Sequence, residues 1–119
     1  MKQPGPDHPI TIVRSGKHVR ISFGGKTIAD TTSAFELKEA SYPAVFYIPR
    51  ADADMALLAR SAHASHCPYK GDASYFTIAV QGRTAENAVW CYEQPFAAVA
   101  AIKDHLAFYP NRVDKIEVE

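Results

Sequence analysis

The sequence predicts a mainly β domain, built from antiparallel sheets with one short helix toward the C-terminal end. Three observations support this fold class. Apolar and polar residues alternate in several short runs, which is the pattern of a half-buried strand. Glycine-containing turns separate neighbouring runs, as they do in hairpins. Only one stretch, near residues 95–105, has the apolar spacing of an amphipathic helix.

The first three runs are typical of strands. In the second run, Val19, Ile21 and Phe23 alternate with polar residues. Ser15-Gly16 and Gly24-Gly25 follow the first and second runs, and glycine accepts the positive φ that tight hairpins require. We therefore expect two hairpin turns, between strands at residues 10–14, 18–23 and 26–29.

The next segments complete the N-terminal half. Residues 34–40 have a helix-forming composition, but two apolar side chains alternate onto one face, which favours a strand. Residues 44–48 form a short apolar run that is typical of another strand and ends at Pro49. Residues 50–60 mix charges and alanines, and we expect a helical turn there, capped by the carboxylate of Asp52.

The C-terminal half contains the clearest strand, at residues 75–80. Phe76, Ile78 and Val80 share one face, and Gln81-Gly82 turns the chain into a further strand over residues 83–92. A final strand or ordered tail is expected from Val113.

The expected helix near residues 95–105 rests on two signals. Pro95 suits the first turn of a helix, where its missing N–H costs nothing. Val99, Ile102 and Leu106 then follow at positions i, i+3 and i+7, which is an amphipathic stripe.

The composition excludes several classes of protein. The 119 residues include 13 basic and 13 acidic ones, 47% are hydrophobic, and the formal net charge is zero. Such a chain is long enough for one core and is not disordered. Without a basic excess, we expect no nucleic-acid partner. No apolar run reaches the ~18 residues of a membrane span, and no signal peptide is evident, so we expect no membrane partner and a cytoplasmic location. We expect a flexible lead-in over residues 1–8 and a single β domain over residues 9–119.

The densest chemistry lies in residues 63–75, which we expect to form a loop before the clearest strand. His63, His66 and Cys67, with Cys91, would offer a nitrogen and sulfur set for zinc. The paired Cys-x-x-Cys or Cys/His spacing of structural zinc sites is absent, however. We therefore predict no bound metal and no cofactor.

Two further local patterns carry catalytic hypotheses. A histidine or Lys70 beside Cys67 would lower the pKa of its thiol and make it a nucleophile, although a small buried thiol is the commoner case. Asp52 and Asp54 have the Asp-x-Asp spacing of a magnesium site, but no glycine-rich phosphate loop accompanies them, which favours an exposed turn.

A small-molecule pocket is the preferred reading of the aromatic residues. Trp90 and Tyr92 share one face of an expected strand, and Tyr75 lies on the strand before it. These rings would form an aromatic wall. Binding sites combine such walls with a few polar groups, which Lys70, His66 and Arg50 would provide. The alternative is that Trp90 simply fills the core.

Several motifs resemble those of the domain of unknown function 427 family. The longest is residues 66–75 (HCPYKGDASY), and shorter ones are residues 39–43 (EASYP), 47–50 (YIPR), 88–93 (AVWCYE) and 108–110 (FYP). The resemblance covers roughly residues 9–113. It implies a small fold similar to the β-tent group, in which two antiparallel sheets meet at an angle. The zinc-holding cysteine pairs of that group are absent here, and the family is sometimes described as nucleotidyltransferase-like.

The resemblance also indicates which residues would line the family's cleft. These are Glu39, Tyr47, Arg50, His66, Cys67, Lys70, Tyr75 and Trp90. Of them, Tyr47, Arg50, His66, Lys70, Tyr75 and Trp90 are the expected ligand-binding residues, and Cys67, Lys70, Glu39 and His66 are the catalytic candidates.

The sequence therefore predicts a domain that binds, and in one version transforms, a small polar or anionic metabolite. Glu39 would act as an acid or base, or as the ion-pair partner of Lys70. This function requires Lys70, Glu39 and Trp90 to converge in space. The competing hypothesis is a non-enzymatic interaction module, such as a homodimer, and nucleotidyltransferase-like activity is a more distant alternative.

Overall fold

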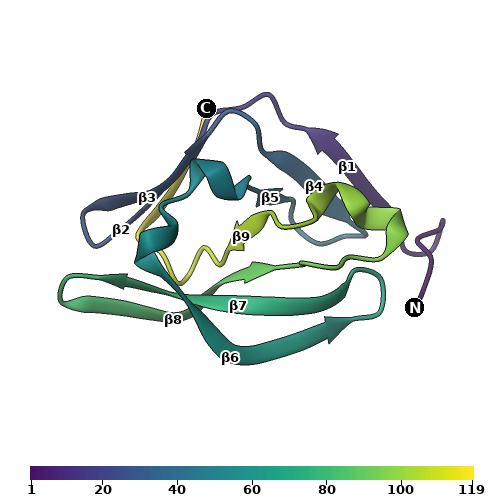
Figure 1. Ribbon diagram of the computed structural model, residues 1–119. Coiled ribbons are helices and arrows are strands. Elements are labelled where there is room, and N and C mark those ends of the chain that lie inside the picture. The colour runs from purple at the N-terminus through teal and green to yellow at the C-terminus, as the bar shows by residue number, and fades with distance from the viewer.

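Three antiparallel sheets make up the structure, a computed structural model that describes all 119 residues (Figure 1). Two sheets have three strands, in the orders β1-β4-β5 and β10-β2-β3, and the third has four strands, in the order β6-β7-β8-β9. In Figure 1 the two smaller sheets lie above β6, β7 and β8 and lean toward each other. The mainly β class is confirmed, with three sheets where the resemblance implied two.

The strands and helices have the following bounds. The strands are β1 (Ile10–Arg14), β2 (Val19–Phe23), β3 (Lys26–Thr31), β4 (Phe35–Glu39), β5 (Val45–Tyr47), β6 (Leu58–Cys67), β7 (Gly71–Val80), β8 (Arg83–Cys91), β9 (Leu106–Phe108) and β10 (Lys115–Val118). The only helices are the 3-10 helices η1 (Arg50–Asp52), η2 (Met55–Leu57) and η3 (Ala97–Ile102). None of them has the length and apolar composition that a membrane span requires.

The glycine turns behave differently at the two predicted hairpins. At Gly24-Gly25 both φ angles are positive, 61° and 77°, and the turn joins β2 to β3 as expected. At Ser15-Gly16 the predicted hairpin is wrong. There β1 pairs with β4, and the N–H of Ser15 continues that pairing by donating to the carbonyl of Ala34 at 3.0 Å. The chain therefore changes sheets at Gly16.

The predicted C-terminal helix is corrected to η3, which consists of two short 3-10 turns separated by a kink. Its backbone is non-helical at Val99, and the N–H of Lys103 bonds the carbonyl of Ala100, which is i→i+3 bonding. Val99 and Ile102 are nevertheless both fully buried, as the apolar stripe predicts. The third residue of the apolar stripe, Leu106, belongs to β9 instead.

Two other local expectations are also corrected. Most of the segment 63–74 is strand rather than loop, because β6 continues to Cys67 and β7 begins at Gly71. Asp52 does not cap a helix. It is the last residue of η1, and its carboxylate accepts a hydrogen bond from the hydroxyl of Thr31 at 2.7 Å.

The interior consists of two apolar clusters on either side of β7. Phe76, Ile78 and Val80 point into the larger cluster, as their alternation predicts, where they meet β2, β3 and β8. Tyr75 and Ala73 point the other way, into a smaller cluster with residues of β4, β5 and η3. The candidate site lies in this smaller cluster.

Candidate functional site

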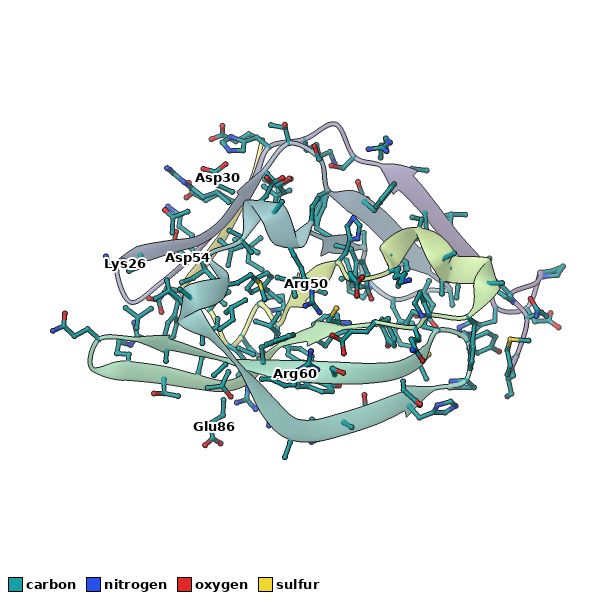
Figure 2. The ribbon with its side chains drawn as sticks, in the orientation of Figure 1. Lys26, Asp30, Arg50, Asp54, Arg60 and Glu86 are labelled. Atoms are coloured by element: carbon teal, nitrogen blue, oxygen red, sulfur yellow. The ribbon has the colours of Figure 1, made fainter.

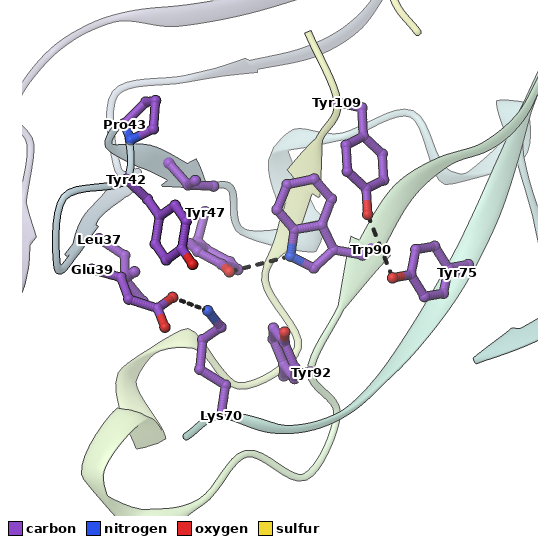
Figure 3. A pocket seen from close by; sticks show the side chains of 11 residues that line it. Leu37, Glu39, Tyr42, Pro43, Tyr47, Lys70, Tyr75, Trp90, Tyr92 and Tyr109 are labelled. Atoms are coloured by element: carbon purple, nitrogen blue, oxygen red, sulfur yellow. Dashed lines mark hydrogen bonds and ion pairs between the residues drawn. The ribbon is translucent and has the colours of Figure 1, made fainter. Parts of the chain in front are cut away.

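A cavity of about 210 Å³ opens between β4 and β5 on one side and β7 and β8 on the other (Figure 3). Five of the eight residues that the family resemblance assigns to the cleft line it, and Lys70, Glu39 and Trp90 converge there. The lining residues are Leu37, Glu39, Tyr42, Pro43, Val45, Tyr47, Lys70, Tyr75, Trp90, Tyr92 and Tyr109.

An ion pair between Lys70 and Glu39 lies at one end of the cavity. The ammonium of Lys70 donates to Oε1 of Glu39, and both side chains are only 12% exposed. The second oxygen of Glu39 accepts a hydrogen bond from Nε2 of His8 at 2.7 Å. Burial raises the pKa of Glu39, but the hydrogen bonds and charges of Lys70 and His8 outweigh it, so the net pKa lies below its usual value. Glu39 is therefore a carboxylate at neutral pH.

The turn between β6 and β7 holds Lys70 in place. The backbone carbonyl of Lys70 accepts a hydrogen bond from the N–H of Phe96 at 3.0 Å, which ties the turn to the segment before η3. The next residue, Gly71, has φ of 114°, and a Cβ there would come within 3.3 Å of the carbonyl of Gln94. Only glycine fits this close approach, so the backbone fixes where the Lys70 side chain begins.

Two largely buried tyrosines bring hydroxyl groups to the cavity. The indole N–H of Trp90 donates to the hydroxyl of Tyr47 at 3.2 Å, and the two rings meet edge to face. The hydroxyl of Tyr92 has no hydrogen-bond partner in the protein, and the residue is 6% exposed, at the cavity. Burial raises the pKa of both tyrosines well above the usual value, so both hydroxyls keep their protons.

A second pair of tyrosines closes the opposite end of the cavity. The hydroxyls of Tyr75 and Tyr109 lie 3.5 Å apart, and that of Tyr75 also bonds Ser65 at 2.8 Å. Burial, together with the contact with Tyr75, raises the pKa of Tyr109 to about 12. The ring of Tyr109 packs on Trp90 with centroids 4.4 Å apart, which completes the aromatic wall.

Arg50 belongs to a different cluster, centred on Glu93. Figure 2 labels its two arginines, Arg50 and Arg60. Arg50 and Arg60 donate to the carboxylate of Glu93 at 2.9 and 2.6 Å, and Ser74 donates to it at 2.9 Å. Arg50 also donates to the thiol of Cys91 at 3.3 Å. Arg50 does not line the cavity, because these contacts occupy its guanidinium group.

The Glu93 cluster predicts a loss of stability in acid. The hydrogen bonds from Arg60, followed by those from Ser74 and Arg50, lower the pKa of Glu93 to about 2, from 4.5, despite burial. As the pH falls, the carboxylate of Glu93 is therefore protonated in the unfolded chain before it is protonated in the folded one. We expect ionised Glu93 to contribute about 1–2 kcal/mol to the free energy of unfolding, because its side chain is one-third exposed and solvent screens its ion pairs. This contribution should be present above pH 4.5 and lost toward pH 2.

Urea denaturation of the wild type and of Glu93→Gln between pH 7 and about pH 2.5 measures this effect. The variant should lose less stability across the acid range than the wild type does. Glu86→Gln is the control, because Glu86 is exposed and makes no ion pair. If the free energy of unfolding falls equally with pH in the wild type and in Glu93→Gln, the prediction is wrong.

His66 and Cys67 do not line the cavity either. His66 is exposed, and its Nδ1 bonds the carboxylate of Asp72 at 2.7 Å. Cys67, the next residue along β6, is half-buried and packs against the smaller cluster. Neither of the groups expected to activate Cys67 bonds it, since His66 contacts Asp72 and Lys70 pairs with Glu39.

The residues considered for metal binding are not brought together. No group of three or more His, Cys, Asp or Glu side chains converges closely enough to hold an ion. His63 packs its ring against Tyr75, and Cys91 is a buried free thiol whose pKa is raised by burial. The carboxylate of Asp52 is used by Thr31.

Several residues of the cavity, and His8 beside it, lie outside the site that the sequence predicts. Tyr42 and Tyr109 occur in the motifs but were not assigned to the site, and Tyr92 was assigned only to the aromatic wall. His8 carries no local signal, because it lies among prolines 31 residues before its partner Glu39 along the chain.

Comparison with known proteins agrees with the motifs. A search of curated proteins gives no match. The family model described as Domain of unknown function (DUF427) matches residues 11–119, which is nearly the whole chain. The chain therefore belongs to the DUF427 family.

Proposed function

We propose that this domain binds a small polar or anionic molecule, bearing a carboxylate or a similar acceptor group, in the cavity beside Lys70 and Trp90. One observation carries the proposal: hydrogen-bond donors that have no protein acceptor converge in the cavity. These donors are accessible from the cavity, and a ligand oxygen would supply the acceptor that the protein does not.

Three side chains provide these donors. An ammonium group has three N–H bonds, and Glu39 accepts only one of those of Lys70. The oxygen of Tyr47 accepts from Trp90, which leaves its own O–H without an acceptor, and the O–H of Tyr92 is likewise unpaired. The only carboxylate in the cavity, Glu39, already accepts from two donors.

A carboxylate is the group that matches this set best. It accepts several hydrogen bonds at once, and charge-assisted bonds are roughly twice as strong as neutral ones. Because Glu39 balances the charge of Lys70, the attraction comes from these bonds rather than from a net positive field. The rings of Trp90 and Tyr109 would pack against the apolar part of the ligand.

Trp90 provides a direct assay, since it is the only tryptophan and lines the cavity. We expect benzoate to change its fluorescence on titration, and to bind about tenfold more tightly than benzyl alcohol, because a charge-assisted bond replaces a neutral one. If benzoate leaves Trp90 fluorescence unchanged, or binds no better than the alcohol, the proposal is wrong.

Tyr92→Phe separates binding from folding. The hydroxyl of Tyr92 bonds nothing in the protein, so the variant should keep its melting temperature while binding benzoate about tenfold less tightly. Tyr69→Phe is the matched control, because Tyr69 stacks on His8 outside the cavity. Equal affinity in the two variants would show that the free hydroxyl does not contact the ligand.

A further inference from the structure

We infer that the ligand is an amphipathic carboxylic acid, whose hydrocarbon chain occupies a second, apolar cavity on the other side of Trp90. The inference rests on the proposed function and extends it to a class of ligand. It depends on three properties of the second cavity: its lining, its position and its size.

The second cavity has a volume of about 230 Å³ and an apolar lining. Val19 and Ile21 of β2, Ile116 of β10 and Phe108 of β9 contribute to its walls. None of its nine lining residues carries a charge. The only polar side-chain group is the indole N–H of Trp90, and Tyr47 already accepts that hydrogen. A molecule in this cavity would find no free side-chain hydrogen-bonding group, so the lining favours a hydrocarbon.

The two cavities share a wall, formed by Val45 and Trp90. The segment 42–46 runs along both cavities. Tyr42 and Pro43 line the first cavity, Ala44 and Phe46 line the second, and Val45 lines both. The two cavities therefore adjoin, and in the inferred complex the hydrocarbon chain follows the segment 42–46 from Lys70 past Trp90 into the apolar cavity.

The second cavity is open at the surface of the domain, and apolar side chains form nearly all of its lining. Apolar concavities at a protein surface are typical of binding grooves, whose walls bury the hydrocarbon part of a ligand. Donors at one end and hydrocarbon walls at the other are the two halves of a site for one amphipathic molecule.

Straight-chain carboxylates test this inference, with Trp90 fluorescence as the readout. Butyrate is short enough to occupy the first cavity alone, and decanoate is long enough to reach the second. We expect the affinity to rise about two- to fourfold for each added CH₂ between these lengths. Octanol should bind much more weakly than octanoate, because it lacks the charged group that Lys70 and the tyrosines bind.

Methyl NMR locates the chain independently of affinity. Ile21 and Ile116 line only the second cavity, so their methyl signals should shift with decanoate and not with butyrate. Ile10 in β1 is the internal control, because it lines neither cavity. Ala44→Phe narrows the second cavity and should therefore weaken the rise of carboxylate affinity with chain length. Ala51→Phe should leave that dependence unchanged, because Ala51 is also exposed but lines neither cavity.

The outcomes separate this inference from the proposed function. If butyrate and decanoate bind equally and the Ile21 and Ile116 signals do not move, the amphipathic ligand is wrong and the proposed function stands. If octanol binds as tightly as octanoate, the second cavity binds hydrocarbon without the carboxylate, which also overturns the inference. If no carboxylate changes the fluorescence of Trp90, both proposals fail.

Discussion

Replacing Glu39 with leucine should lower the free energy of unfolding by about 3–5 kcal/mol. The substitution removes the partner of Lys70, whose side chain is only 12% exposed, so its ammonium group cannot regain full hydration in that position. The large effect measures the cost of an unpaired buried charge, not the net worth of the ion pair. Urea denaturation of the wild type and the variant at neutral pH measures it.

The double variant Glu39→Leu/Lys70→Met distinguishes this explanation from a loss of packing. With both charges removed, no charge is left unpaired, and we expect most of the lost stability to return. Glu117→Leu is a matched control at the surface ion pair with Lys115, where the two atoms lie 3.6 Å apart. That variant should lose less than about 1 kcal/mol. A double variant that is no more stable than Glu39→Leu would contradict the explanation.

The fold could be predicted where a strand buries one face. Phe76, Ile78 and Val80 alternate because β7 covers the larger cluster with that face, and the sequence therefore shows the strand directly. β6 could not be predicted in this way. It is a mostly exposed edge strand, rich in alanine, serine and histidine, which forms by pairing with β7 rather than by burying an apolar face.

The site was predicted in part for a related reason. Trp90 and Tyr75 are directly opposite each other on β8 and β7, so neighbouring strands in the sequence already bring them together. Lys70 and Glu39 are 31 residues apart, and only the family resemblance placed both in one cleft. Arg50 carries the right chemistry for a ligand, but its partner Glu93 lies 43 residues away along the chain, and no local pattern reveals that contact.

The largest effect in the core is expected at Ile78. Its side chain is fully buried on the central strand β7, where it meets strands of another sheet, so it joins two sheets that share no hydrogen bonds at this point. Ile78→Ala should lower the free energy of unfolding by about 2–5 kcal/mol, since it loses both the burial of the side chain and the packing around it. Ile78→Val removes a single methylene and should lose about 0.5–1.5 kcal/mol.

Val13→Ala is the control for this series, because Val13 is 56% exposed on β1 and belongs to neither cluster. It should change the free energy of unfolding by less than about 0.5 kcal/mol. If Ile78→Ala loses no more than Val13→Ala, then Ile78 does not hold β7 against β2 and β3. In that case the larger cluster would not fix the position of the four-stranded sheet. It would then also not position Tyr75 and Trp90, which line the cavity from that sheet.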